Sequence, residues 1–375
     1  MKIAITKSTL RIPPTYFATA HAQQLADRHD FRVFTLAADI RDESVTVPVT
    51  DFVPRTGLGF RQRELMIPAF MPLMTLAVRR YRPDLIHQHF ATWSLPAVNA
   101  SRQSGAPLLT TLHGSDIVSL ANPADTLMAQ WHHRNVLAAA AHSRRILAVS
   151  NYLAGRAAAL GLDPAKIQVH YQGVDTDYFV PGREHDSAQP PVVLFVGTLN
   201  TQKGIRDLID ASLAVWRRAH HRLVVVGDGP LRDAVQEQAA SHPHIEFLGR
   251  LPREQIRSWM QQAYLLVAPS QEAGGAREAA GLVLLEAQAC GTPVLAYRSG
   301  GIPEMVDDGA SGLLAAEGDY PGLRAALGDL LRLSAAEHRN MRQAARRFAE
   351  EHRSLAGSCA ELEQHYLETA ATAAR

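Results

Sequence analysis

The sequence is poor in cysteine and has no long apolar run, and each shortage excludes a class of protein. Two cysteines, Cys290 and Cys359, occur in 375 residues; they are too few for a disulfide framework and lack the paired spacing of a zinc site. No run reaches the roughly 18 apolar residues of a membrane span, and the apolar stretch after Met1 is too short for a signal peptide. We therefore expect a cytoplasmic protein that is neither secreted nor membrane-spanning.

The chain also lacks an excess of charge of either sign. It carries 38 Lys and Arg against 37 Asp and Glu, a formal net charge of +1. Without a bulk positive field nothing favours a phosphate backbone as partner, so we expect no nucleic-acid binding. The length itself suffices for two or three domains of about 100 to 200 residues, each with its own core.

Short β-rich apolar runs alternate along the chain with longer stretches of helical spacing. The runs lie at residues 3–6, 32–37, 84–87, 108–112 and 146–150, and again at 192–197, 222–227, 245–249, 264–269 and 293–297. This alternation favours parallel strands joined by helices. A proline-rich segment without periodicity, residues 179–191, separates the two series and is typical of a linker.

We therefore predict an α/β protein of two Rossmann-like doubly wound domains that face each other across a cleft. The expected limits are 1–180 for an acceptor-binding domain, 181–191 for the linker and 192–350 for a donor-binding domain. A helical segment at 351–375 could then pack back on the first domain. In open parallel sheets, ligands bind outside the carboxyl ends of the strands, so these ends should carry the functional residues.

The most informative stretch is residues 269–303, where a Gly- and Ala-rich loop joins a predicted strand to a helix that begins near Gly281. The amides of Gly281, Leu282 and Val283 would point out of the helix start, where the helix dipole favours a diphosphate. Glu286 lies one turn along the same face and suits the vicinal hydroxyls of a ribose, while Glu278 in the loop suits an attached sugar. A nucleotide-sugar site is thus predicted, against the ordinary alternative of two solvated surface charges.

Polar residues also follow strands in the first half. His113 ends a predicted strand just before Gly114, where it serves either structure or a ligand, and Asp116 either places His113 or caps the next helix. His87 and His89 form an H-x-H pair on one strand face. A metal site would need further ligands, so we predict no metal and assign His89 and Asp116 to the acceptor side.

Several motifs together resemble the retaining group-one (family four) glycosyltransferases with the GT-B fold. Glu278 and Glu286 are separated by seven residues and followed by AQACGTPV and GGIPE; FVGTLNTQKGIRDLIDA from Phe195, VVVGDGPLRDAV from Val224 and TLHGSDI from Thr111 resemble further family motifs. The match covers most of the chain and is more specific in the second half.

The resemblance implies metal-independent, retaining transfer of a hexose from a nucleotide diphosphate sugar to a hydroxyl acceptor, as in polysaccharide biosynthesis. The acceptor could be a glycan, a lipid-linked saccharide or a small molecule. No cofactor is expected: Gly227 and Gly229 begin like a dinucleotide fingerprint, but Arg232 occupies its third glycine position.

By position, the resemblance also implies a role for each candidate residue. His113 and Glu278 would contact the donor sugar as catalytic residues, and Lys203 would pair with the diphosphate. The other implied donor contacts are Glu286 with the ribose, Arg250 near the base, and the amides of Gly281, Leu282 and Val283. An arginine commonly follows the glycine of the family's phosphate loop, but Thr198 stands there, so Thr198 or Arg206 would have to substitute for it.

Other functions suit the same two-domain architecture. A nucleotide-sugar epimerase would change the sugar nucleotide without an acceptor, a phosphorylase would consume inorganic phosphate, and a binding-only homologue would show affinity without turnover.

Residues 61–83 are apolar, methionine-rich and flanked by Arg61, Arg63, Arg79, Arg80 and Arg82. They are typical either of a peripheral membrane contact or of core packing, and Pro68 and Pro72 argue against a clean amphipathic helix.

Overall fold

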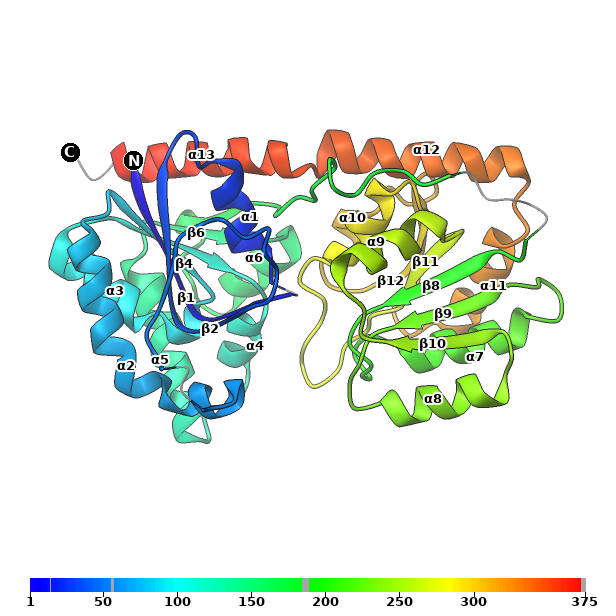
Figure 1. The fold of residues 1–375 in the computed structure, drawn as a ribbon, viewed down its shortest axis with the longest axis horizontal. Helices are drawn as coiled ribbons and strands as arrows, with labels where there is room; N and C mark the ends of the chain where they lie inside the picture. The colour runs from blue at the N-terminus through cyan, green and yellow to red at the C-terminus, as the bar shows by residue number, and fades with distance from the viewer. Residues whose placement is uncertain (14, 55–56, 184–188, 372–375) are drawn as a thin grey trace. The chain divides into compact units, whose positions relative to one another are not determined.

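The computed structural model describes residues 1–13, 15–54, 57–183 and 189–371 (Figure 1). The chain divides into two compact units: unit 1 comprises Met1–Gln172 and the chain from Ser358 onward, and unit 2 comprises Gly173–Gly357. Residues 184–188 of the predicted linker and 372–375 of the predicted C-terminal segment lie outside the described residues. The domain limits expected at 180, 192 and 350 remain predictions.

Unit 1 is built on a seven-stranded sheet with the order β3-β2-β1-β4-β5-β6-β7, in which every pairing is parallel. The chain winds outward from β1 to β3 and from β4 to β7, so the topological switch point lies between β1 and β4. The strands are β1 (Lys2–Ile12), β2 (Asp30–Ile40), β3 (Val49–Asp51), β4 (Leu85–His89), β5 (Leu108–Leu112), β6 (Arg145–Ala148) and β7 (Ile167–Val169).

Helices cover both faces of this sheet, and α3 packs against both α2 and α5. From Ser358 onward α13 belongs to unit 1, where the Tyr366 hydroxyl is hydrogen-bonded to His87 Nδ1 at 2.8 Å. The helices are α1 (Phe17–Gln24), α2 (Phe60–Tyr81), η1 (Ala91–Trp93), α3 (Leu95–Ser104), α4 (Ser115–Ala121), α5 (Leu127–His142), α6 (Asn151–Ala159), η2 (Pro164–Lys166) and α13 (Leu355–Ala371).

Residues 60–81 form one continuous helix despite the two prolines, which corrects the expectation that these would prevent an amphipathic helix. Its buried face includes Ile67, Met71 and Met74, and this packing outweighs the hydrogen bonds that the prolines cannot donate. Arg63 is also a correction. Rather than bracketing a surface patch, it is buried, donates to the carbonyls of residues 38 and 53, and pairs with Asp51 at 2.9 Å.

Unit 2 is built on a six-stranded sheet, also entirely parallel, with the order β10-β9-β8-β11-β12-β13. Its switch point lies between β8 and β11. The strands are β8 (Val192–Val196), β9 (Arg222–Val226), β10 (Ile245–Gly249), β11 (Leu265–Ala268), β12 (Val294–Arg298) and β13 (Gly312–Ala316). The helices are α7 (Ile205–Val215), α8 (Arg232–Ser241), α9 (Arg253–Gln262), α10 (Leu282–Ala289), η3 (Ile302–Met305), α11 (Tyr320–Leu330) and α12 (Ala335–His352).

The two sheets confirm the predicted doubly wound α/β architecture, with differences at the sheet edges. β5 and β10 have the predicted bounds, whereas β1 extends to Ile12 because it continues to pair with β2. The sequence analysis predicts no strand at β3, β7 or β13. All three lie at sheet edges, and none is fully buried. β3 and β7 have three residues each with a polar residue at the centre, so they lack the apolar run of a central strand, whereas β13 is apolar and was missed.

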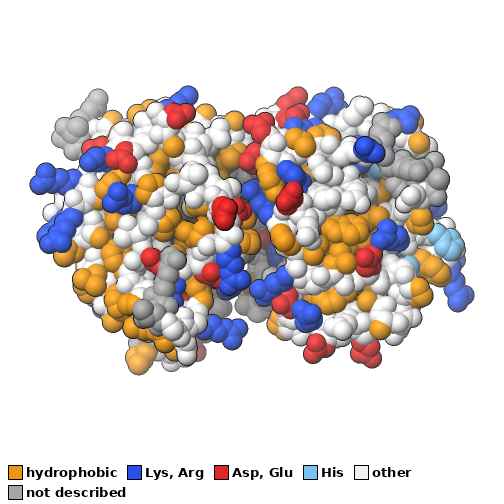
Figure 2. Space-filling view, in the orientation of Figure 1, with side chains coloured by type: hydrophobic (Ala, Val, Ile, Leu, Met, Phe, Trp, Pro, Cys, Tyr) orange, Lys and Arg blue, Asp and Glu red, His pale blue; other side chains and the backbone are white. Residues whose placement is uncertain are grey.

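Large exposed hydrophobic side chains concentrate on two helices of unit 1. Leu65 and Leu73 lie on α2, while Leu127 and Met128 begin α5; Leu65 and Leu127 are 83% and 85% exposed. Figure 2 shows hydrophobic side chains gathered over α2 on the face of unit 1 that is in view. Among the described residues, no helix combines the length and apolar character needed to cross a membrane.

Candidate functional site

In unit 2, the loops that follow β8 and β11 meet at the switch point of the sheet. Lys203, in the loop after β8, forms an ion pair with Glu278, in the loop after β11. Both side chains are partly exposed, at 27% and 18%. The sequence analysis assigned these residues to adjacent parts of one ligand but missed their direct contact, because 75 residues separate them in the chain.

The two loops are held together through their backbones. The amide of Gln271 donates to the carbonyl of Gln202 at 2.8 Å. Gly204 begins α7 in the left-handed conformation, and a Cβ there would lie 2.0 Å from the carbonyl oxygen of Pro269. A side chain at this position would force the loops apart, so glycine is required for the Lys203 and Glu278 side chains to meet.

The glycines of VVVGDGP have a similar structural role. A Cβ on Gly227 would lie 1.8 Å from the carbonyl oxygen of Gly197, and one on Gly229 would lie 2.5 Å from that of Leu199. The Gly197 amide also donates to the Val226 carbonyl at 3.0 Å. These glycines allow the loops after β8 and β9 to pack closely together. This close packing accounts for the two glycines without a dinucleotide ligand.

The GGIPE motif positions the backbone of Glu278. The Gly301 amide donates to the Glu278 carbonyl at 2.9 Å, and a Cβ on Gly300 would lie 2.1 Å from that same oxygen. At the end of β13, Glu317 accepts hydrogen bonds from Arg277 and from Ser299, on either side of this contact. The resemblance identified GGIPE only as a family mark; the structure adds this physical role.

Helix α10 begins at Leu282, as predicted, with Gly281 as its N-cap at φ 82°. Because Gly281 has no side chain to cap the helix, the first-turn amides are not covered by one. Glu286 lies one turn further and is partly buried. Burial raises the pKa of Glu286 to about 7, and the charge of Arg253 only partly opposes this. A carboxyl that titrates near neutrality beside a helix N-terminus is typical of a binding site.

The other residues predicted on the donor side are more exposed. Arg250 is 73% exposed and pairs with Asp228, with 3.0 Å between Nε and Oδ2. Thr198 and Arg206 are both exposed. Both side chains are therefore accessible to a ligand, and neither is packed in the core of unit 2.

In unit 1, His113 lies directly after β5 and within an aromatic cluster. The rings of Phe17 and Phe90 stack against its ring with centroids 4.2 Å and 4.3 Å away. Its Nε2 is hydrogen-bonded to His89 Nδ1 and its Nδ1 to Gln172 Nε2, both at 3.0 Å. Burial lowers the pKa of His113 well below its ordinary value, and the charge of Lys7 lowers it further.

Asp116 and His89 both act on His113. Asp116 accepts a hydrogen bond from the His113 amide at 2.7 Å and another from Ala91 at 2.5 Å. Of the two roles left open for Asp116, this contact favours the placement of His113. His89 is only 3% exposed and contacts the His113 ring, so in this structure it lies behind His113 rather than on an open surface.

His87 is buried between β5 and α13. Its ring nitrogens contact the hydroxyls of Tyr366 at 2.8 Å and Thr111 at 2.7 Å. In the described ranges, no group of three or more His, Cys, Asp or Glu side chains is arranged to hold a metal ion. The H-x-H pair is therefore used within the fold of unit 1.

Lys7 is a member of this cluster that sequence reasoning missed. It lies on β1 just beyond the last residue pair with β4, Thr6 with Gln88, at the switch point of unit 1. Its Nζ donates to the Thr9 carbonyl at 2.7 Å and lies 4.5 Å from the centre of the Phe90 ring. Burial lowers the pKa of Lys7 to about 8, and Asp116 opposes the shift. The available signal was a lysine that directly follows the apolar start of the strand, residues 3–6.

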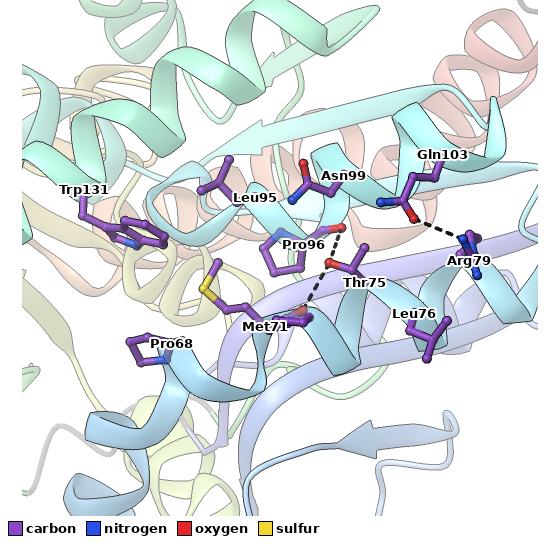
Figure 3. A pocket seen from close by; sticks show the side chains of 11 residues that line it. Pro68, Met71, Thr75, Leu76, Arg79, Leu95, Pro96, Asn99, Gln103 and Trp131 are labelled. Carbon is purple, nitrogen blue, oxygen red and sulfur yellow. Dashed lines mark hydrogen bonds between the residues drawn. The ribbon is translucent and has the colours of Figure 1, made fainter.

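A separate pocket of about 390 Å³ lies among α2, α3 and α5 (Figure 3). Two hydrogen bonds connect α2 to α3 in the wall of this pocket, from Thr75 to the Pro96 carbonyl and from Arg79 to Gln103, both at 3.4 Å. Trp131 of α5 and Met71 of α2 supply apolar surface. The pocket thus combines an apolar interior with a cationic group at its edge.

Comparison with known proteins places both units in one family. A family model described as "Glycosyl transferases group 1" matches residues 190–332, and one described as "Glycosyltransferase Family 4" matches residues 15–178. A glycogen synthase from Mycobacterium tuberculosis is 30% identical over 304 residues, covering 76% of this chain and 69% of that one. A 2-deoxystreptamine N-acetyl-D-glucosaminyltransferase from Streptomyces fradiae is 34% identical over 274 residues, covering 67% and 63%.

Solved structures share the fold. HepE from Anabaena, crystallised with UDP and glucose, has a TM-score of 0.77 at 22% identity, and the match covers 98% of this chain and 100% of that one. Sucrose-phosphate synthase from Thermosynechococcus elongatus has a TM-score of 0.80 at 20% identity, covering 99% and 100%. The chain belongs to the group 1 glycosyltransferases and has the two-domain α/β GT-B fold that its motifs indicated.

Proposed function

We propose that this glycosyltransferase moves a hexose from a nucleoside diphosphate sugar to a hydroxyl acceptor, with retention of configuration and without a metal ion. The observation that carries the proposal is the Lys203–Glu278 ion pair beside the start of α10, at the switch point of unit 2. It places a cation, a carboxylate and helix amides at the same sheet edge, where parallel sheets bind nucleotides. HepE, which shares the fold, was crystallised with UDP-glucose.

The donor diphosphate would bind between Lys203 and the first amides of α10. An ammonium group has three donors, so Lys203 can hold Glu278 and a phosphate oxygen at once. As the bond to the sugar breaks, negative charge grows on the leaving diphosphate. A fixed cation and a helix N-terminus stabilise that charge more in the transition state than in the bound donor, which accelerates transfer.

Glu278 and Glu286 would have different roles. Glu278 is held by Lys203 and by the Gly301 amide, so its carboxylate is placed to accept hydrogen bonds from donor-sugar hydroxyls. Glu286, one turn into α10, would bind the ribose. With Glu278 held in an ion pair, we favour attack by the acceptor on the face that the diphosphate leaves, rather than a covalent glycosyl-enzyme.

On the acceptor side, His113 would contact the donor sugar as a catalytic residue. Asp116 holds its backbone and His89 holds its ring, so these two act as positioning residues for His113. This refines the direct acceptor contact expected of His89 and Asp116. Phe17 and Phe90 both pack against the ring, with centroids 4.2 Å and 4.3 Å away, and restrict its rotation.

The function is tested by incubating the purified chain with a panel of UDP-, GDP- and ADP-sugars, with and without hydroxyl acceptors, and analysing products by NMR. We expect sugar transfer that depends on an acceptor, an anomeric configuration equal to that of the donor, and full activity in excess chelator. Sugar interconversion without acceptor would establish an epimerase, and strict dependence on phosphate would establish a phosphorylase. Nucleotide affinity without turnover would indicate a binding-only homologue.

We also propose that unit 1 contacts an anionic membrane surface through α2 and α5. Leu65, Leu73 and Leu127 are exposed on these helices, and exposed arginines at 61, 79 and 80 accompany them. Exposed apolar side chains with nearby cations suit a surface that carries anionic lipid.

Sedimentation with phosphatidylcholine vesicles, with and without phosphatidylglycerol, tests this contact. Binding should require phosphatidylglycerol and be lost in L65D/L73D but not in L367D, a control at an exposed leucine of α13; equal binding by both variants would contradict the assignment.

A further inference from the structure

We propose that Gln172 holds His113 as the neutral tautomer with its proton on Nε2, and is thus a positioning residue of the proposed transferase. Gln172 Nε2 lies 3.0 Å from His113 Nδ1. An amide nitrogen can only donate, so Nδ1 must be the unprotonated acceptor. The remaining ring proton then belongs to Nε2, which lies 3.0 Å from His89 Nδ1 and donates to it. With the amide nitrogen of Gln172 facing the ring, as in this structure, the hydrogen-bond chain has this one consistent proton arrangement.

The position of Gln172 is itself set by two other elements of unit 1. The residue is 7% exposed, and its backbone carbonyl oxygen lies 2.9 Å from His21 Nε2 on α1. The same His21 nitrogen lies 3.0 Å from the hydroxyl of Ser358 on α13. Contacts through Ser358, His21 and Gln172 therefore connect the C-terminal helix to His113.

Burial and the charge of Lys7 oppose the protonation of His113. Lys7 on β1 is the nearby cation, and Asp116 on α4 is engaged by the His113 and Ala91 amides. The other titratable groups that face His113 are histidines at positions 21, 87, 89 and 170. A second proton on the ring would have to displace the Gln172 donor and would face the charge of Lys7.

With its two nitrogens engaged by Gln172 and His89, the ring is held in one orientation and has no free nitrogen to act as a general base. His113 would then aid transfer by orientation, and the rate would depend on the Gln172 amide. The kinetic part of this inference rests on the proposed function, whereas the tautomer does not.

Proton-detected NMR of the full chain labelled with ¹⁵N-histidine tests the tautomer directly. The signal of His113 is identified by its loss in H113N. We expect an unprotonated Nδ1, a protonated Nε2, and no titration between about pH 6 and about pH 8, the range in which ordinary histidines titrate. A proton on Nδ1, or titration in this range, would overturn the inference.

Gln172→Glu has the same size but offers only acceptors, so it should draw a proton onto Nδ1 and stabilise the imidazolium. We expect kcat to fall by about tenfold or more with the donor KM nearly unchanged, and a new ionisation in the pH profile of kcat. Gln168→Glu adds the same charge at an exposed position on β7 and should leave the profile unchanged. An unchanged profile in Gln172→Glu would contradict the positioning role.

The two proposals fail separately. A wild-type chain that transfers sugar but shows the Nδ1 proton retains the proposed function and refutes the role of Gln172. A chain with the expected tautomer but no transfer refutes the function alone. If Gln172→Glu does not fold, as circular dichroism would reveal, the wild-type NMR signals still decide the tautomer.

Discussion

The proposed sites of the two units are built in opposite ways. In unit 2 the site is largely backbone: glycines at 204, 227, 229 and 300 allow loops to approach within distances that a Cβ would forbid, and α10 offers its first amides. In unit 1 it consists of side chains, with His113 enclosed by aromatic rings and hydrogen-bonded to two buried residues. A backbone site requires glycine at fixed places, so it leaves a motif in the sequence. A side-chain cluster assembled from distant strands leaves only part of itself in a motif, here His113 and Asp116 in TLHGSDI.

The difference should appear most strongly on acidification, where we expect unit 1 to lose stability before unit 2. Burial lowers the folded-state pKa of the histidines concerned below the ordinary 6.5, so below about pH 6.5 the unfolded chain binds protons that the folded unit does not. Each such histidine lowers the free energy of unfolding by about 1.4 kcal/mol for every pH unit below this value, as long as the folded residue stays neutral. The histidines whose pKa burial lowers include His21, His87, His89, His113 and His170 in unit 1, and His221 and His244 in unit 2.

Hydrogen exchange followed by mass spectrometry between about pH 7.5 and about pH 5.5, corrected for the intrinsic exchange rate, resolves the two units. Peptides from β4 and α13 should lose protection before peptides from β8 and β11. Earlier loss in unit 2 would show that its two histidines matter more than the larger cluster.

The backbone character of the unit 2 site is tested by Gly204→Ala. A methyl group there would meet the Pro269 carbonyl at 2.0 Å, in addition to the strain of a left-handed alanine. We expect a loss of about 3 to 5 kcal/mol in the free energy of unfolding. Gly318→Ala is the matched control, because Gly318 has φ 76° but nothing within 4 Å of a Cβ, so it should cost about 1 to 2 kcal/mol. Equal losses of stability in the two variants, measured by urea titration, would mean that small shifts relieve the close contact with the Pro269 carbonyl.

Glu278→Gln should chiefly reduce the rate. The neutral amide keeps the shape but weakens both the contact with Lys203 and the bonds to hydroxyls of a sugar that becomes cationic. We expect kcat to fall by about 100-fold, comparable to removing one transition-state hydrogen bond, with nucleoside diphosphate affinity changed little. Calorimetry with the nucleotide alone is the control, since it lacks the sugar. A large loss of nucleotide affinity would reverse the orientation proposed for this loop.

Lys203→Ala should weaken donor binding by about 1.5 to 3 kcal/mol, the range for a charged hydrogen bond. Arg206→Ala, three residues along the chain and exposed, is a matched loss of charge. It should have a smaller effect unless Arg206 substitutes for the family arginine that Thr198 replaces. Unchanged donor affinity in Lys203→Ala, measured by calorimetry, would remove Lys203 from the proposed site.

The smallest expected effect is the pH dependence of nucleotide binding. Burial raises the pKa of Glu286 to about 7, and ribose hydroxyls that donate to its carboxylate would favour the charged form. Affinity should therefore rise with pH through about 7 and fall by up to about tenfold for each unit below it. Glu286→Gln should weaken binding and flatten this dependence, with kcat within about tenfold of the wild-type value. The same slope in the variant would assign the titration to another group.

Much of the fold could be predicted from the sequence because central strands are buried on both faces, and the run at 108–112 matches the buried strand β5. The run at 245–249 also matches β10, although β10 lies at a sheet edge. The edge strands β3 and β7 could not be predicted, because each has three residues with a polar residue at its centre; β13 is apolar and was missed. Core packing of residues 61–83 was one of the expected roles, but the continuity of the helix through Pro68 and Pro72 was not predicted, because its packing within unit 1 outweighs the local propensity of proline.

By itself the sequence determined the class of the protein, the start of α10 and the placement of Lys203, Glu278 and Glu286 beside strand ends. The fold class, the helix start and the two glutamates follow from local rules: the period of apolar residues, the conformational freedom of glycine and the geometry of a helix start. Lys203 was identified by the family resemblance. Only the tertiary structure decided that Lys203 pairs with Glu278, that GGIPE holds the Glu278 backbone, and that Gln172 and His89 engage the two nitrogens of His113. Those contacts join residues far apart in the chain, and parallel strands with helical crossovers bring such residues to one sheet edge without leaving a local pattern.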